Sequence, residues 1–165
     1  VLLSSIKAET LKHYIGKTVE EVAIERGTNP EETIIDLVVE SENSIAAVFF
    51  LMSEDNVKAQ MKLPWMSFGS DAEAVAPEGK VLQQGAHPRT YGNFARVLGK
   101  YVRDEKVITL EDAIYKLTAL PASNLKIADR GKLQQNYYAD VVVFDPKTIS
   151  DHATFDQPHQ LSGGV

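Results

Sequence analysis

Residues 65–71 read Trp-Met-Ser-Phe-Gly-Ser-Asp and place a carboxylate directly after a short apolar stretch. We expect residues 65–69 to form a β-strand that ends at Ser70 and Asp71. The strand predicted before it, residues 45–52, reads IAAVFFLM and is apolar on both faces of the pleat. That pattern is typical of a parallel sheet that is covered on both sides. Residues 1–6 predict a third strand.

Helix signals separate these strands. Thr18-Val-Glu-Glu21 is a capping box, and the helix that it begins is predicted to end at Arg26-Gly27. Asn29-Pro30 predicts a second helix, and Ser53 a third. We expect the apolar face of the second helix at Ile34, Ile35, Val38 and Val39. The order of strand, helices, strand, helix and strand predicts an α/β fold with right-handed βαβ units, either an open doubly wound sheet or an arc of a (β/α)8 barrel.

The second half of the chain begins with a long irregular segment. Residues 72–90 show little periodicity, and a loop of this length is often functional. Apolar residues then recur at helical spacing from Tyr91 to Val102, which predicts a helix. Thr109 is expected to cap a further helix, and Leu120-Pro121-Ala122 to open a short helical turn. Residues 139–145, ADVVVFD, predict a strand.

Composition limits the classes of partner. The chain has 165 residues with 17 Lys and Arg against 23 Asp and Glu, a formal net charge of −6, and no block of basic residues. We therefore expect neither nucleic acid nor an anionic membrane surface as the main partner. No apolar run approaches the ~20 residues that a membrane-spanning helix needs. The absence of cysteine excludes thiolate nucleophiles and Cys-ligated zinc, and fits a cytoplasmic protein.

The first residues suggest that the chain is part of a longer polypeptide. They read VLLSSIKAET, with neither the basic region nor the cleavage site of a signal peptide. The chain also opens on Val rather than Met, inside an apolar run.

Four residues are candidates for chemistry. Asp71 follows a predicted strand, where reacting groups project in parallel α/β sheets and barrels; alternatively, Ser70 or Asp71 caps the following segment. Arg89 is either a bidentate clamp for a carboxylate or a solvated surface arginine. Phe49 and Met52 either line a pocket at the end of their strand or belong to the core. His13, His87, His152 and His159 form no H-x-H or H-E-x-x-H pattern, so they do not make a zinc site by themselves.

Six motifs occur in a fixed order along this sequence. They are Gly69-Ser-Asp71, His87-Pro-Arg89, Tyr91-Gly-Asn-Phe-Ala-Arg-Val-Leu-Gly-Lys-Tyr-Val102, Leu120-Pro-Ala122, Asp129-Arg-Gly131 and Ala139-Asp-Val-Val-Val-Phe-Asp-Pro146. Together they resemble the C-terminal part of the N-acyl-D-amino-acid deacylases, or D-aminoacylases, of the amidohydrolase superfamily. The resemblance runs from about residue 1 to 160. It implies the C-terminal arc of a (β/α)8 barrel over residues 1–131 and part of a small β-sandwich over residues 132–165.

The resemblance also implies roles for the four candidates. Asp71 would contact the weaker metal position and carry a proton from metal-bound water to the leaving nitrogen. Arg89 would bind the α-carboxylate of the substrate, and Phe49 and Met52 would line the pocket for its side chain, with a weak preference for an apolar one. The family usually has Gly after the catalytic Asp, where this chain has Ala72.

The implied cofactor is Zn2+ in the intact protein. The family's H-x-H motif, bridging Cys and further metal-binding histidines lie upstream of the residues present here. We therefore expect this chain alone to bind no zinc tightly and to hydrolyse no amide. The implied small-molecule partner is an N-acyl-D-amino acid.

Two other interpretations stay open. In the first, the intact protein is another amidohydrolase, related to hydantoinase or dihydroorotase. Such enzymes share the Asp at the end of the strand and the β-sandwich. The chain is alternatively a non-catalytic, truncated assembly module. In each case, unpaired strand edges predict either self-association or contact with the missing N-terminal part of the same protein.

Overall fold

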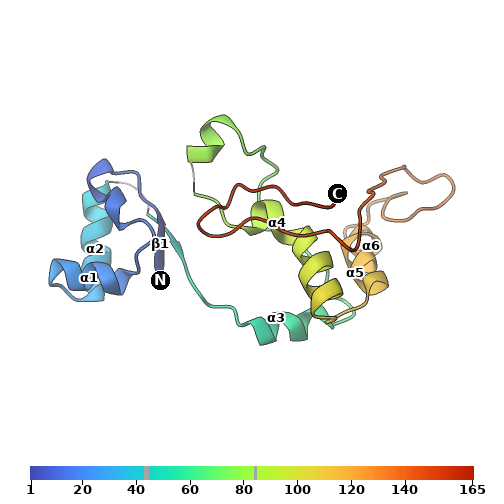
Figure 1. Ribbon diagram of the computed structural model, residues 1–165, viewed down its shortest axis with the longest axis horizontal. Coiled ribbons are helices and arrows are strands. Elements are labelled where there is room, and N and C mark those ends of the chain that lie inside the picture. The colour runs from blue at the N-terminus through green and yellow to red at the C-terminus, as the bar shows by residue number, and fades with distance from the viewer. Residues whose placement is uncertain (43–44, 84) are drawn as a thin grey trace. The chain divides into compact units, whose positions relative to one another are not determined.

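The computed structural model describes residues 1–42, 45–83 and 85–165, which form two compact units (Figure 1). The first unit contains Val1–Ser53 and Gln83–Gly85, and the second contains Glu54–Leu82 and Ala86–Val165. The predicted domain boundary after residue 131 does not coincide with this division, and it stays a prediction. Of the predicted loop over residues 72–90, residue 84 lies outside the described residues.

The first unit joins a two-stranded sheet to two helices. Strand β1 (Leu2–Ser5) pairs antiparallel with β2 (Ala46–Val48), and the 3-10 helix η1 (Glu9–Tyr14) follows β1. Helices α1 (Val19–Arg26) and α2 (Pro30–Ser41) come between the strands. The core of this unit comprises Leu3, Ile6, Leu11, Tyr14, Val19, Val22 and Leu37.

The predicted capping signals of α1 and α2 are confirmed. Thr18 Oγ1 accepts a hydrogen bond from the Glu21 amide at 3.2 Å, and the Thr18 amide donates to the Glu21 carboxylate at 2.7 Å. Helix α1 ends at Gly27, whose φ of 68° lies in the left-handed region that suits glycine. Asn29 Oδ1 accepts from the Glu32 amide at 2.8 Å and caps α2. Local hydrogen bonds therefore set these helix ends.

The predicted apolar face of α2 is exposed within the described chain, and the helix buries another side. Ile34, Ile35, Val38 and Val39 are all exposed, and Thr33, Leu37 and Ser41 are buried instead. The buried residues are spaced four apart and so lie along one side of the helix. Thr33 is paired with the Thr28 hydroxyl at 2.7 Å and with the Asn29 carbonyl, so its burial leaves no polar group unsatisfied. The side that α2 buries thus consists of Leu37 and two hydroxyl residues, which apolar periodicity does not reveal.

The apolar run at residues 45–52 forms a strand over only three residues. Its partner is β1 and the pairing is antiparallel, so the predicted parallel strand over the whole run is wrong. Phe49 and Met52 lie beyond the strand and are 60 % and 69 % exposed. A core role for these two side chains within the described chain is thereby contradicted.

The second unit consists of helices and irregular segments. Helix α3 (Glu54–Met61), the 3-10 helix η2 (Gly79–Gln83) except its last residue, helix α4 (Arg89–Arg96), the π-helix η3 (Val97–Asp104), and helices α5 (Leu110–Leu117) and α6 (Ala119–Asn124) follow in order. The predicted helices after Ser53, from Tyr91 and after Thr109 are confirmed, as is the helical turn at Leu120. The core comprises Met61, Ala95, Val97, Leu98, Tyr101, Ile108, Ala113 and Ile149.

Two predicted strands of this unit are absent from the part of the chain that the structure describes. Residues 65–69 and 139–145 are extended or irregular, and neither pairs with another segment there as a strand of a sheet. A strand requires a neighbour for its backbone hydrogen bonds, and no periodicity within a segment supplies one. In residues 65–69, Met66 and Phe68 pack against the core and Trp65 is exposed. Among the described helices, none is both long and apolar enough to cross a membrane.

Candidate functional site

The segment that carries Asp71 packs against the core at its beginning and is exposed to solvent at its end. Phe68 packs against the core of the second unit, and the chain then continues through Gly69 and Ser70 to Asp71. Asp71 has a φ of 49°, in the left-handed region that aspartate enters more readily than most residues. Its side chain is 85 % exposed. The residues that follow it, 72–78, form no helix, so Asp71 does not act as a helix cap.

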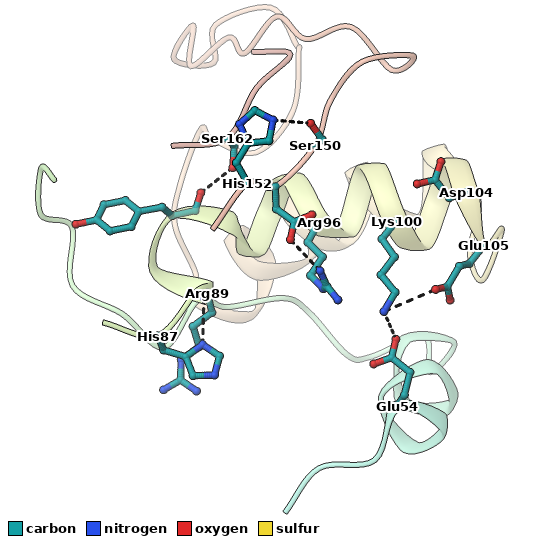
Figure 2. A network of polar contacts seen from close by, with 12 residues as sticks. Glu54, His87, Arg89, Arg96, Lys100, Asp104, Glu105, Ser150, His152 and Ser162 are labelled. Carbon is teal, nitrogen blue, oxygen red and sulfur yellow. Dashed lines mark hydrogen bonds and ion pairs between the residues drawn. The ribbon is translucent and has the colours of Figure 1, made fainter. Parts of the chain in front are cut away.

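Arg89 brings a positive charge to this carboxylate. It is the first residue of α4, and its Nη2 atom lies 2.7 Å from Oδ2 of Asp71. Its backbone amide donates to Nδ1 of His87 at 3.1 Å, which fixes the turn that leads into the helix (Figure 2). The structure thus joins two residues that the sequence singled out separately, 18 positions apart.

His87 lies beside this ion pair. Its ring meets Phe155 edge-on, with centroids 5.0 Å apart. Burial lowers the pKa of His87, the positive charge of Arg89 lowers it further, and Asp71 acts in the opposite direction. The neutral ring is therefore favoured, with Nδ1 as acceptor and the proton on Nε2.

Asn93 lies one turn after Arg89 on α4 and was not expected from the sequence. Its Nδ2 atom donates to the carbonyl oxygen of Gly69 at 3.2 Å. Residues four apart on a helix share one face, so the spacing of Arg89 and Asn93 was a usable signal. The sequence does not show which segment faces α4, so the spacing alone does not identify the group that Asn93 contacts.

Helix α4 and the π-helix η3 are tied to the rest of the second unit by charged groups (Figure 2). Arg96 pairs with Asp151 at 2.8 Å, and Arg103 donates to the carbonyl oxygen of Ile149 at 2.6 Å. Lys100 bonds to Glu54, and this contact lowers the pKa of the Glu54 carboxyl. These contacts hold the helical segment that carries Arg89 and Asn93 against the rest of the second unit.

A pocket of about 210 Å³ opens beside the first turns of α4. Its polar lining includes Arg89, Asn93 and Ser162, and its apolar lining includes Phe94, Val142 and Phe144. The Ser162 hydroxyl donates to the carbonyl oxygen of Tyr91 at 2.7 Å and holds the C-terminal segment against the helix. An anionic group attached to an apolar one matches this lining chemically.

The other two predicted site residues are in the first unit. Phe49 and Met52 are exposed there, whereas Asp71 and Arg89 belong to the second unit. Their role as a side-chain pocket stays a prediction.

The described residues do not provide a metal site of their own. They contain no group of three or more His, Cys, Asp or Glu side chains that could hold an ion. Zinc in proteins takes three or four such ligands, so the lone carboxylate of Asp71 does not fit a complete site.

The comparisons with known proteins define the class. The model of the amidohydrolase family matches residues 22–164, and the chain belongs to that family. The chain is 37 % identical over 150 residues to the D-aminoacylase of Alcaligenes xylosoxydans xylosoxydans, covering 91 % of this chain and 28 % of that enzyme. It is 43 % identical over 119 residues to the N-acyl-D-glutamate deacylase of the same organism, covering 72 % of this chain and 23 % of the relative.

A solved structure gives the same result. The N-acyl-D-glutamate deacylase of Bordetella bronchiseptica, complexed with zinc and a phosphonate mimic of the tetrahedral intermediate, superposes with a TM-score of 0.82 at 36 % identity. The match covers 99 % of this chain and 31 % of that structure. The predicted resemblance to D-aminoacylases is thereby confirmed. The chain spans less than a third of the length of these relatives.

Proposed function

We propose that this chain supplies the C-terminal part of a zinc-dependent deacylase that hydrolyses N-acyl-D-amino acids to a carboxylate and a free D-amino acid. In this proposal residues 1–131 complete a (β/α)8 barrel and residues 132–165 belong to a β-sandwich. The support is the similarity over nearly the whole chain to deacylases of this type. The chain alone is expected to be inactive, because it offers zinc one carboxylate.

The observation that carries the proposal is the contact between Asp71 and Arg89. In an N-acyl amino acid the scissile nitrogen and the carboxylate carbon are both bonded to the α-carbon, about 2.5 Å apart. A group that protonates this nitrogen and a group that binds this carboxylate must therefore be neighbours. The 2.7 Å separation of the two side chains meets that requirement.

The two residues divide the work. The guanidinium of Arg89 binds the α-carboxylate through charge-assisted hydrogen bonds and so aligns the amide. Asp71 accepts a proton from the attacking water as its oxygen bonds to the acyl carbon, and gives it to the amide nitrogen as the C–N bond breaks. Zinc, when bound, would activate this water, with Asp71 as the ligand that this chain contributes. Phe49 and Met52 would line the pocket for an apolar substrate side chain.

Substitutions in the intact enzyme test these roles. Asp71→Asn should lower kcat by about 10²–10⁴-fold, the usual contribution of general acid–base catalysis. Asp36→Asn, at an exposed carboxylate on α2, is the matched control and should leave kcat unchanged. Arg89→Ala should raise KM for a free-acid substrate more than about 10-fold and hardly affect the corresponding α-amide.

Two results would contradict the proposal. Retained turnover in Asp71→Asn would remove the proton-transfer role. An equal effect of Arg89→Ala on free-acid and α-amide substrates would remove the carboxylate clamp.

Exposed apolar residues support the view that further polypeptide completes the fold. Residues 141–143 are all valine and are exposed, as is the apolar side of α2. We propose that these surfaces contact the N-terminal part of the same enzyme, and that the chain by itself would associate through them. A monomeric chain at millimolar concentration would refute this part of the proposal.

A further inference from the structure

One face of α4 contacts both ends of the three-residue segment Gly69-Ser70-Asp71. Arg89 reaches the Asp71 carboxylate at 2.7 Å, and Asn93 reaches the Gly69 carbonyl at 3.2 Å. The two helical residues are four apart, so a single turn of helix fixes the distance between their contacts.

We infer that Asn93 is a positioning residue for Asp71, an inference that rests on the proposed function. A substrate carboxylate shares the guanidinium of Arg89 with Asp71, so the contact between Arg89 and Asp71 weakens when the substrate binds. Within the described chain, the amide of Asn93 is then the remaining hydrogen bond from α4 to this segment. Asn93 therefore keeps the segment in place during the step in which Asp71 moves a proton.

The segment has little else to hold it. A Cβ atom at Gly69 would meet nothing within 4 Å, and the side chain of Asp71 is largely in solvent. Asp71 has a left-handed φ of 49°, a sparsely populated region that aspartate enters more readily than most residues. One hydrogen bond at Gly69, two residues before Asp71, restricts the backbone that carries the carboxylate.

The two elements joined by the hydrogen bond between Asn93 and Gly69 are both packed against the core. Phe68 is packed against the core directly before Gly69, and Ala95 of α4 belongs to the same core. A hydrogen bond between two anchored elements loses less entropy than one between mobile elements. Asn93 is thus well placed to control the geometry of Asp71.

The test uses three variants of the intact enzyme. Asn93→Leu keeps the shape of the side chain but removes the amide donor without adding charge. Asn93→Gln keeps the amide and serves as the conservative variant. Asn124→Leu makes the same replacement at an exposed residue at the end of α6 and controls for a general effect of leucine.

The expected result is a loss in kcat without a loss in substrate binding. Asn93→Leu should lower kcat about 3–10-fold, the value of one hydrogen bond, with KM for the free acid unchanged within about twofold. Its dissociation constant for a phosphonate analogue of the tetrahedral intermediate, measured by calorimetry, should rise by the same factor. Asn93→Gln should keep kcat within about threefold, and both leucine variants should keep the melting temperature of the parent.

Other outcomes overturn the inference. An unchanged kcat, a rise in KM alone, or an unchanged phosphonate affinity would exclude a positioning role. A kcat loss in Asn93→Leu that accompanies a lower melting temperature and is not reduced in Asn93→Gln would show a structural role instead. If Asp71→Asn and Arg89→Ala behave as proposed, such results reject only the role of Asn93; if those two variants fail, the proposed function itself is rejected.

Discussion

Replacing Gly99 by alanine should loosen the contact between η3 and the C-terminal segment. A Cβ atom at Gly99 would lie 2.6 Å from the carbonyl oxygen of Ile149, whereas ordinary contact begins at 3.4 Å. The backbone of Ile149 would have to retreat by about 0.8 Å, the difference between these two distances. That retreat is resisted, because the same oxygen accepts a hydrogen bond from Arg103 and the Ile149 amide donates to the carbonyl of Asp145.

The magnitude follows from three effects. Overpacking costs about 1–3 kcal/mol, and weakening a charge-assisted hydrogen bond costs about 1.5–3 kcal/mol if it is lost completely. The higher helix propensity of alanine offsets about 1 kcal/mol. We therefore expect Gly99→Ala to lower the free energy of unfolding by about 2 kcal/mol, which for a chain of this length lowers the melting temperature by about 4–8 °C.

Thermal unfolding followed by circular dichroism measures this change. Gly69→Ala is the matched control, because a Cβ atom there meets nothing within 4 Å and its stability should differ by less than about 0.5 kcal/mol. A Gly99→Ala variant that melts at or above the temperature of the parent would refute the reasoning, since it would show that the two segments separate without cost.

Two further predictions concern the buried Lys116 and the titration of His87. The side chain of Lys116 is 1 % exposed, donates to the Met61 carbonyl and lies 3.1 Å from Asp112, so Lys116→Met should cost about 2 kcal/mol in urea unfolding. Lys62→Met, at an exposed lysine, should cost almost nothing, and equal stabilities of the two variants would contradict the prediction. For His87, burial and then the charge of Arg89 lower the pKa, so the unfolded chain binds the proton more tightly and stability should fall as pH drops below about 6.5. An NMR titration of His87 with a midpoint above about 6.5 would exclude this mechanism.

The helices of this chain could be predicted because their signals are local. The Thr18 capping box, the Asn29-Pro30 start and the Thr109 cap each place a side-chain acceptor within three residues of the amide that it satisfies. All three helices begin where the sequence indicates. Such contacts form whatever the rest of the chain does, and sequence is sufficient to find them.

The strands could not be predicted equally well because their stability depends on distant partners. Residues 45–52 are apolar enough for a buried strand, yet only Ala46–Val48 find a neighbour in β1. Residues 141–143 have the same character and stay exposed without a strand partner among the described residues. Periodicity reports the preference of a segment for the extended state and says nothing about which other segment satisfies its backbone.

For the candidate site, the sequence indicated which residues matter but not how they are arranged. Motif similarity named Asp71 and Arg89, but their contact spans 18 positions and depends on how residues 65–71 lie against α4. The role inferred for Asn93 depends on a hydrogen bond to a backbone carbonyl 24 positions away. A carbonyl acceptor carries no sequence signature, so this contact is visible only in three dimensions.

The exposure of the Asp71–Arg89 pair is consistent with what the proposed reaction requires. A salt bridge at this level of exposure contributes about 0–1 kcal/mol, because water solvates both charges well when they separate. A buried pair would resist separation by several kcal/mol and would compete strongly with the substrate carboxylate for the guanidinium. The weak pair instead holds both groups near their working positions and lets the substrate take the place of Asp71 at small cost.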